Sequence, residues 1–326
     1  MRRCSWLAGA VWSLFGLGIA PGALAAGAAD GADPPTTVLL GTSTPGGGFE
    51  LFGQSLAEVI NGSEPRLRVT GLATRGSSHN LALLEAGEID LGLVEGNAAR
   101  RALDGVDRAP AALRVLAVMY PNPGMFAVRG DSSDRTIEDL RGKPVVFGTR
   151  ASGLRILLND VIDGLGLSAE QDFQAIILEK AADGPRLVQT GEAQALWGAG
   201  IGWPGFVRLA DGPAGARFIA PSAAQIQAIL ERHPHLRRMS VPAGTYQGQT
   251  ERIDSVGLWS LILVRPDLSE ATAYRLAQAI HGGAQLLASR LPQGRYTTAE
   301  NTVAEVPEER LHPGAARYYR DAGLLP

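Results

Sequence analysis

Two turns that contain glycine carry the residues best suited to holding a small anion. Residues 42–48 (TSTPGGG) follow a short apolar stretch and precede a helical pattern, and residues 149–153 (TRASG) repeat this arrangement. The first backbone N–H groups of a helix have no partner within the helix, so they can donate to an anionic group. Ligands of open α/β sheets bind at the carboxyl ends of the strands, where such turns lie. One turn in each of two lobes therefore predicts a site in a cleft between them, although each turn could also be a simple connector.

Charged side chains near these turns are candidates for direct contacts with a ligand. Arg75 and Arg150 could each hold a carboxylate through two parallel hydrogen bonds, although an isolated arginine is more often a surface residue. We expect Arg150 to contribute more, because Arg75 lies one residue outside the turn that follows it. Glu95 follows an apolar stretch and could meet an ammonium group, or it could pair with Arg100 or Arg101.

Two tryptophans flank a glycine-rich segment. Trp197 and Trp203 enclose residues 198–202 (GAGIG). Glycines let the backbone approach a ligand closely, while an aromatic ring can form a wall of the site. The alternative, that these tryptophans belong to the hydrophobic core, agrees equally well with the sequence.

The residue sets that covalent catalysis requires are missing from the sequence. It contains neither a G-x-S-x-G motif nor a phosphate-binding G-x-x-x-x-G-K-[ST] loop, and its single cysteine, Cys4, lies near the start. His233 and His235 could bind a metal, but no second pair of ligands accompanies them, so a solvated turn is favoured. We therefore expect no enzymatic activity, no cofactor and no metal site.

The first residues have the pattern of a secretory signal peptide, which we place at residues 1–25. Arg2 and Arg3 precede an apolar run at residues 6–19, and a small-x-small site follows at residues 23–25. An uncleaved anchor is the alternative, but the apolar run is shorter than the ~20 residues that cross a membrane. The sequence therefore predicts a mature protein in the periplasm.

The composition is that of a mildly acidic soluble protein. Hydrophobic residues make up 45% of the chain and charged residues 19%, and the net charge is −3 before the leader arginines are removed. Such a charge argues against nucleic acid and anionic membrane surfaces as partners. A chain of this length can bury a full core in one or two domains. We expect a monomer.

Strand and helix patterns alternate along the rest of the chain. Two successive strand–turn–helix series predict an α/β protein with two lobes, each with a mostly parallel sheet flanked by helices. The longest apolar strand, expected at residues 256–264, would return the chain to the first lobe. A helical pattern then continues for about five turns over residues 270–291. We expect lobe I at residues 36–127 and 256–326 and lobe II at residues 128–255, with a hinged cleft between them.

Five short motifs resemble, in the same order, those of one receptor family. Three of them, at residues 41–48, 83–91 and 140–145, occur widely among periplasmic-binding folds. The two distinctive motifs are residues 242–249 (PAGTYQGQ) and residues 311–319 (LHPGAARYY). On these motifs the chain resembles the TAXI family of solute receptors of TRAP transporters, over nearly the whole mature sequence.

This resemblance implies a type II periplasmic-binding-protein fold, a sodium-coupled TRAP permease as membrane partner, and glutamate, glutamine or another small organic acid as ligand. It places the ligand contacts in residues 42–49, 76–80, 95–97, 149–153 and 197–203. Arg75, Glu95 and both tryptophans differ from the residues usual in the family, which leaves the ligand open. The predicted ligand-binding residues are Thr42, Gly46, Gly47, Gly48, Phe49, Arg75, Ser77, Asn80, Glu95, Asn97, Arg150, Ser152, Gly153, Trp197 and Trp203.

Two other functions are compatible with the sequence. A periplasmic receptor of the same class could serve a different transporter or a sensor. A secreted enzyme could also use this fold, because fold alone does not decide function. Such an enzyme would need a nucleophile with a base within reach, and the sequence shows no such set.

Overall fold

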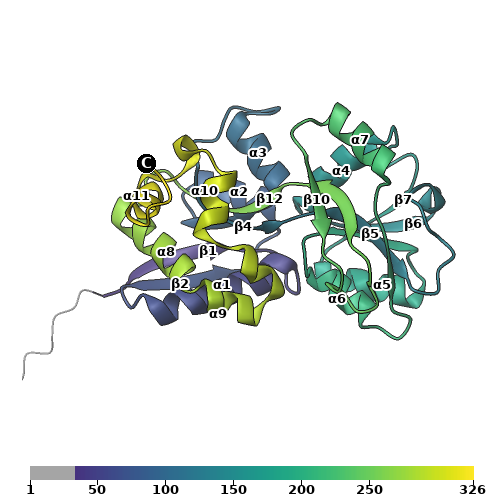
Figure 1. Ribbon diagram of the computed structural model, residues 1–326, viewed down its shortest axis with the longest axis horizontal. Helices are drawn as coiled ribbons and strands as arrows, with labels where there is room; N and C mark the ends of the chain where they lie inside the picture. The colour runs from purple at the N-terminus through teal and green to yellow at the C-terminus, as the bar shows by residue number, and fades with distance from the viewer. Residues whose placement is uncertain (1–33) are drawn as a thin grey trace, which may run out of the picture. The chain divides into compact units, whose positions relative to one another are not determined.

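Two five-stranded sheets organise residues 34–326, the part of the chain that the computed structural model describes. The signal peptide predicted for residues 1–25 lies outside the described residues. Within residues 34–326, no helix combines the length and the apolar character needed to cross a membrane. Figure 1 shows the two sheets, each with its own set of helices, which we call lobe I and lobe II.

Lobe I is built on a mixed sheet. Its strands are β1 (Thr36–Gly41), β2 (Leu67–Leu72), β3 (Leu91–Val94), β4 (Arg114–Pro121) and β12 (Trp259–Val264). Their order is β2-β1-β3-β12-β4; β1 is parallel to β2 and β3, whereas β12 is antiparallel to β3 and β4. Parallel neighbours need crossover connections, and these are helices here. The helices of lobe I are α1 (Gly48–Ser63), α2 (Ser77–Glu85), α3 (Gly96–Asp104), α8 (Glu270–Gly282), α9 (Ala284–Arg290), α10 (Ala299–Glu305), α11 (Pro313–Asp321) and the short 3-10 helices η3 (Pro292–Tyr296) and η4 (Glu308–Arg310).

Lobe II repeats this plan. Its strands are β5 (Gly124–Arg129), β6 (Pro144–Thr149), β7 (Gln174–Leu178), β8 (Ala195–Ala199) and β9 (Ala216–Ile219). Their order is β7-β6-β8-β5-β9, with β6 parallel to β7 and β8, and β5 antiparallel to β8 and β9. A separate antiparallel pair joins β10 (Arg237–Val241) and β11 (Ile253–Gly257). The helices of lobe II are η1 (Glu138–Leu140), α4 (Leu154–Gly164), η2 (Ala181–Asp183), α5 (Gly184–Thr190), α6 (Pro204–Ala210) and α7 (Ala223–Arg232).

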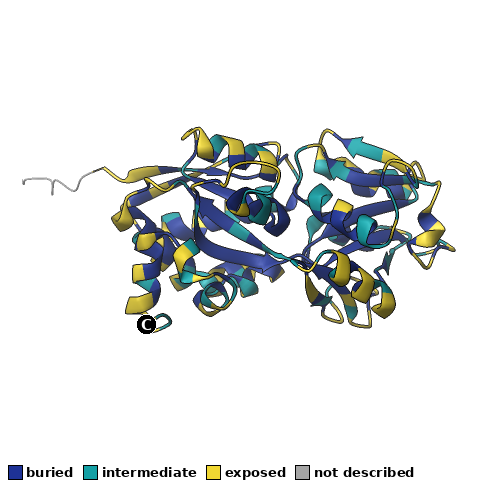
Figure 2. Ribbon diagram, turned by 90° about the horizontal axis from the view of Figure 1, so that it is seen from above, coloured by how far each residue is buried: buried dark blue, intermediate teal, exposed yellow. Residues whose placement is uncertain are grey.

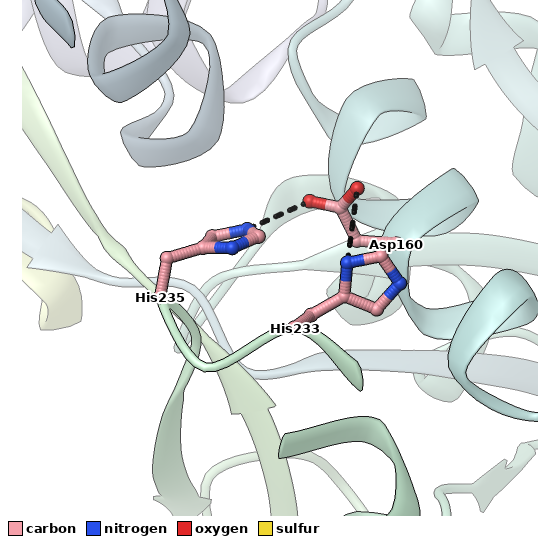
Figure 3. A group of neighbouring side chains, drawn as sticks. All are labelled: Asp160, His233 and His235. Atoms are coloured by element: carbon pink, nitrogen blue, oxygen red, sulfur yellow. Dashed lines mark hydrogen bonds and ion pairs between the residues drawn. The ribbon is translucent and has the colours of Figure 1, made fainter. Parts of the chain in front are cut away.

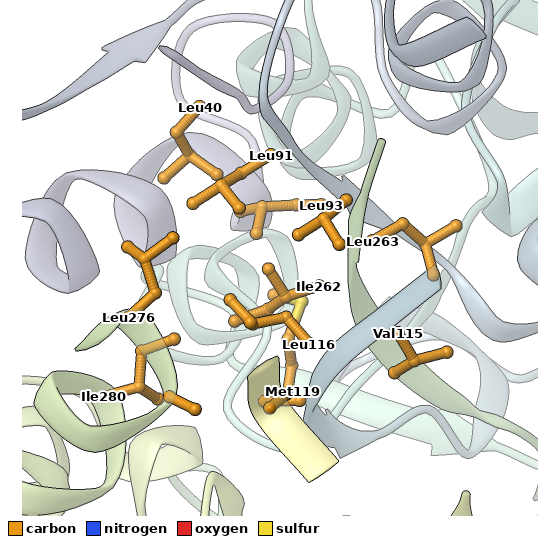
Figure 4. Packing of buried hydrophobic residues seen from close by; sticks show 14 of the residues in the cluster. Leu40, Leu91, Leu93, Val115, Leu116, Met119, Ile262, Leu263, Leu276 and Ile280 are labelled. Atoms are coloured by element: carbon orange, nitrogen blue, oxygen red, sulfur yellow. The ribbon is translucent and has the colours of Figure 1, made fainter. Parts of the chain in front are cut away.

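Each lobe buries its own hydrophobic core. In lobe I, Leu40 of β1 and Leu91 and Leu93 of β3 belong to one cluster with Leu276 and Ile280 of α8, and none of these side chains is exposed (Figure 4). The spacing of four between Leu276 and Ile280 puts both on one face of the helix. Figure 2 shows the strands as mostly buried and the exposed residues mainly on the helices and loops around them.

The core of lobe II covers both faces of its sheet. Phe126 and Val128 of β5 belong to one cluster, whereas the alternate residues Met125 and Ala127 belong to another. Successive side chains of a strand point to opposite faces of the sheet, so this alternation shows that both faces are covered. The continuous apolar character of these strands follows from that burial.

The chain crosses between the sheets at two adjacent segments. The first crossing is Asn122-Pro123, between β4 and β5. Residues 124–127 therefore pair within the sheet of lobe II, whereas we expected them in lobe I. The second crossing is Leu258, which divides the single strand expected at residues 256–264 into β11 and β12. An added Cβ on Gly257 would lie 1.9 Å from the carbonyl oxygen of Asn122, so the two crossings pass each other too closely for any side chain there.

The long C-terminal helix expected at residues 270–291 is also divided. Helix α8 ends at Gly282 and α9 begins at Ala284. An added Cβ on Gly283 would lie 2.1 Å from Cγ1 of Val59 on α1. The helix breaks at a position that packs closely on α1, and the glycine makes this contact possible.

Candidate functional site

A cavity lies between the two lobes, at the carboxyl ends of their strands. It encloses about 710 Å³, including its open mouth. Lobe I contributes the segments that follow β1, β2 and β3 and the end of β4, and lobe II contributes the segments that follow β6, β7 and β8. This is the position that the two glycine turns predicted.

Most of the predicted contact residues line this cavity. Those that do so are Gly47, Gly48, Phe49, Arg75, Ser77, Glu95, Ser152, Gly153, Trp197 and Trp203. Their contact with a ligand stays a prediction, but the fold brings them together from segments that are far apart in the sequence. Thr42, Gly46, Asn80, Asn97 and Arg150 do not line the cavity.

Asn80 holds the backbone beneath the cavity and does not face into it. Its side chain is fully buried, and its Nδ2 donates to the carbonyl oxygens of Thr42 and Leu93, each at 2.8 Å. Its Oδ1 accepts a hydrogen bond from Thr74 Oγ1 at 2.7 Å. Because these bonds join the ends of β1 and β3 to α2, Asn80 positions the turns that line the cavity.

Thr42 and Gly46 also have structural partners. Thr42 Oγ1 donates to the carbonyl oxygen of Leu72 at 2.8 Å, which ties the end of β1 to the end of β2. The carbonyl oxygen of Gly46 accepts a hydrogen bond from the guanidinium of Arg208 on α6. Gly46 therefore contributes to a contact between the lobes.

Of the two candidate arginines, Arg75 lies at the cavity and Arg150 does not, whereas we expected Arg150 to contribute more to ligand binding. Arg75 lines the cavity, although its side chain also reaches solvent. Arg150 is exposed and lies outside the lining, and its carbonyl oxygen faces the guanidinium of Arg155 at 3.5 Å. The prediction that Arg150 would contribute more than Arg75 is not supported by this geometry, because the turn at residues 149–153 directs its backbone and Ser152 toward the cavity instead.

Glu95 is a buried carboxyl group at the start of α3. It is 1% exposed, and its Oε2 accepts hydrogen bonds from the backbone N–H groups of Asn97 at 2.9 Å and Ala98 at 3.3 Å. Its Oε1 accepts a hydrogen bond from Asn97 Nδ2 at 3.2 Å, which explains why Asn97 lies behind the cavity wall. Burial raises the pKa of the Glu95 carboxyl to about 7, although the hydrogen bonds from Asn97 and Ala98 oppose this rise. Glu95 can therefore change its protonation state near neutral pH.

The two tryptophans have different roles. Trp197 is 1% exposed, and its Nε1 donates to the carbonyl oxygen of Leu154 at 2.9 Å. Its ring packs edge-to-face with Phe126, and the ring centroids are 4.9 Å apart. It is a core residue that also forms part of the cavity wall. Trp203 is partly buried and lies against lobe I, because an added Cβ on Gly48 would be 2.9 Å from its Cδ1.

The lobes touch each other around the cavity. Backbone N–H of Ser78 donates to the carbonyl oxygen of Ala151 at 3.2 Å, and backbone N–H of Ala181 donates to Thr44 Oγ1 at 3.3 Å. An added Cβ on Gly153 would lie 2.5 Å from Cβ of Glu95. The structure is thus a closed arrangement of the two lobes, and Gly153 permits this approach because it has no side chain.

Sequence reasoning missed several residues of the cavity wall. Tyr120 and Asn122, which lie at the end of β4 and directly after it, are both buried and line the cavity. The strand was predicted, so the rule that ligands bind at carboxyl ends could have identified both residues. Burial raises the pKa of Tyr120, whose hydroxyl therefore stays protonated. The remaining lining residues are Ser43, Thr44, Gly76, Phe147, Gly148, Thr149, Leu154, Leu178, Ala181, Leu196 and Ala199.

Comparison with known proteins identifies both a family and a fold. The sequence model of the NMT1-like family matches residues 40–323 of this chain. A protein from Listeria monocytogenes described as a candidate L-cystine ABC transporter has 13% identity, covers 81% of this chain and 98% of its own, and gives a TM-score of 0.52. A protein from Bordetella bronchiseptica RB50 has 15% identity, with 88% and 81% coverage and a TM-score of 0.52. The alkanesulfonate-binding protein from Xanthomonas axonopodis pv. citri, bound to MOPS, has 19% identity, with 90% and 96% coverage and a TM-score of 0.49.

These likenesses confirm the predicted fold class. The chain has the α/β fold of periplasmic binding proteins, with two sheets flanked by helices. In the sheet of lobe I, the late strand β12 lies between β3 and β4. At such low identity the solved structures establish the fold, and the ligand has to be argued from the cavity itself.

Proposed function

Because this chain belongs to the NMT1-like family and has the fold of periplasmic binding proteins, we propose that it is an extracytoplasmic solute receptor. It captures a small polar ligand between its two lobes and delivers the ligand to a membrane transporter. The observation that carries this proposal is the cavity between the lobes, which receives strand ends from both sheets. A site built from two lobes can close around a ligand and release it when the lobes separate.

The ligand carries a carboxylate in this proposal. Helix α1 starts at the N-cap Gly47, and helix α4 starts at the N-cap Gly153; neither glycine has a side chain that could cap its helix. Both residues line the cavity, so the positive ends of two helices face the same space from opposite lobes. Arg75 also lines the cavity, and its guanidinium can hold a carboxylate there. These groups together favour an anion.

Glu95 gives the cavity a second polarity. In its ionised form, the carboxylate attracts an ammonium group, and in its protonated form it can donate a hydrogen bond to a carboxylate. Arg75 and Glu95 therefore suit an amino acid or a small organic acid, with glutamate and glutamine as the first candidates. The aromatic walls from Tyr120, Trp197 and Trp203 would cover the apolar part of such a ligand.

The proposed membrane partner is a TRAP-type permease, on the basis of the five TAXI-like motifs. In the distinctive motif at residues 242–249, Tyr246 is buried, and its hydroxyl donates to the carbonyl oxygen of Gly200 at 2.8 Å. The motif thus supports the loop that leads to Trp203, which lines the cavity. The proposed location is the periplasm, after removal of the signal peptide.

A binding screen tests the receptor function. We expect one ligand of the amino acid or organic acid class to raise the midpoint of thermal unfolding, to bind with a stoichiometry of one in calorimetry, and to be recovered unchanged by mass spectrometry. Conversion of the ligand that is lost on mutation of a cavity residue would instead show an enzyme. Reconstitution in vesicles separates the permease classes, because uptake through a TRAP permease requires a sodium gradient, whereas uptake through an ABC transporter requires ATP.

A further inference from the structure

Two histidines and an aspartate of lobe II gather outside the ligand cavity. Asp160 lies on α4, and His233 and His235 lie in the connection between α7 and β10 (Figure 3). Asp160 is 8% exposed, and the side chains of His233 and His235 are 16% and 20% exposed. The sequence showed a His-x-His pair without further ligands, because Asp160 is more than seventy positions away and only the fold brings it close.

The geometry of this cluster is compatible with a single metal ion. Nε2 of His235 lies 3.0 Å from Oδ2 of Asp160, and Nδ1 of His233 lies 3.8 Å from Oδ1 of Asp160. One ligand atom from each of the three residues lies within 4.8 Å of the others. Ligand atoms about 2.0–2.2 Å from a tetrahedral ion are separated by about 3.3–3.6 Å. Small side-chain movements would therefore bring all three atoms onto one ion.

His233 is oriented in the way that metal-binding histidines usually are. Its Nε2 lies 2.8 Å from Oδ2 of Asp163, and Asp163 is held in turn by Arg232, whose Nη2 donates to Oδ1 at 2.7 Å. A proton on Nε2 leaves the lone pair on Nδ1, which is the atom that faces Asp160. A carboxylate that fixes the outer nitrogen of a histidine is a common support of metal sites.

Hydrogen bonding between these side chains explains only part of the arrangement. The contact of His235 with Asp160 at 3.0 Å is an ordinary hydrogen bond. The separation of 3.8 Å between His233 Nδ1 and Asp160 Oδ1 is too long for a hydrogen bond and is that of an ion pair, which forms only when the His233 ring is protonated (Figure 3). A neutral His233 would instead present its Nδ1 lone pair to the same space as the Asp160 carboxylate, and a metal ion bound by both groups would satisfy both.

We propose that Asp160, His233 and His235 bind a divalent transition-metal ion such as Zn²⁺. Two imidazole nitrogens and one carboxylate oxygen suit this class of ion and leave one position for water. His235 also lines a second hollow, with Arg100 and Glu305 of lobe I, through which water and the ion can reach the site. The bound ion would link α4 to the connection before β10 and so stabilise lobe II.

Metal titration tests the proposal on the full mature chain. After treatment with a chelator and dialysis, the protein is titrated with ZnCl₂ in a calorimeter and with CoCl₂ in a spectrophotometer. We expect one ion per chain, visible absorption bands of Co²⁺ bound to nitrogen ligands, and a higher midpoint of thermal unfolding with Zn²⁺. If an excess of metal gives neither heat of binding nor Co²⁺ absorption bands, the proposal is overturned.

Variants assign the site to its residues. Asp160→Asn and His235→Ala should each weaken Zn²⁺ binding, and Asp163→Asn should weaken it by about 10- to 100-fold through the orientation of His233. His79→Ala, at a histidine in lobe I, is the matched control and should leave the affinity unchanged. Circular dichroism verifies that each variant is folded. Equal affinity in the parent, Asp160→Asn and His235→Ala would show that the metal binds elsewhere and would refute the assignment.

Discussion

Gly153 is the position at which closure of the two lobes can be tested with one added methyl group. Its backbone, with φ −61° and ψ −27°, is in the right-handed helical region, so alanine can adopt it without strain. The added Cβ would nevertheless lie 2.5 Å from Cβ of Glu95 and 2.6 Å from Oγ of Ser77. Optimal contacts between carbon atoms are about 3.5–4.0 Å, so the lobes would have to move apart by roughly 1 Å at this point.

The expected effect of Gly153→Ala is therefore on ligand affinity and not on folding. Overpacking by one methyl group costs about 1–3 kcal/mol, which corresponds to about 5- to 150-fold weaker binding when closure is part of binding. The unliganded protein can relieve the contact by opening, so its midpoint of urea unfolding should stay close to that of the parent. Calorimetry with the ligand from the binding screen measures the affinity, and urea denaturation measures the stability.

Gly62→Ala is the matched control. Gly62 lies within α1, and a Cβ added there would meet open space within 4 Å. This variant should bind the ligand as the parent does. If Gly153→Ala also binds with the parental affinity, the bound state does not include the contact between α4 and Glu95, and the closed structure is not the ligand-binding state.

Three further predictions concern pH, a buried hydroxyl and shape. Burial raises the pKa of Glu95 from 4.5 to about 7, so between these pH values the folded state retains a proton that the unfolded chain releases. The free energy of unfolding should therefore fall as the pH rises from 4.5 to 7, by up to about 3 kcal/mol. Denaturation of Glu95→Gln should show a flatter pH profile, and an unaltered profile would contradict this reasoning. Tyr246→Phe should lower the free energy of unfolding by about 1–3 kcal/mol. The buried hydroxyl donates to the carbonyl oxygen of Gly200 at 2.8 Å and accepts from the N–H of Gly202 at 3.1 Å, and both hydrogen bonds would be lost. A denaturation midpoint equal to that of the parent would refute this prediction. Small-angle scattering should show a smaller radius of gyration with ligand, whereas an equal radius would indicate a rigid site.

The parts of the site that depend on local pattern could be predicted from the sequence. Each strand–turn–helix unit, β1 with α1 and β6 with α4, lies within about 25 neighbouring residues. The order of these elements and the position of the cleft could therefore be inferred from local patterns. The general rule for ligands at the carboxyl ends of strands then placed Gly47, Gly48 and Gly153 at the cavity.

The direction of individual side chains could not be predicted in the same way. Asn80 looked like a ligand contact, but its partners Thr42 and Leu93 are 38 and 13 positions away and become neighbours only in the folded lobe. Whether Arg75 or Arg150 faces the cavity depends on the path of each turn, which the residue types do not determine. The division of residues 256–264 at Leu258 reflects the close passage of the two crossings, which is a contact between distant segments.

The claim that a charged ligand is held between the lobes is tested most directly by calorimetry on two arginine variants. Arg75 lines the cavity and Arg150 does not, although both are exposed arginines next to glycine-containing turns. A hydrogen bond to a charged group contributes about 1.5–3 kcal/mol, so Arg75→Ala should weaken binding of the identified carboxylate ligand by about 10- to 150-fold. Arg150→Ala should bind like the parent. Parental affinity in Arg75→Ala, or a larger loss in Arg150→Ala, would contradict the account of the cavity as the carboxylate site.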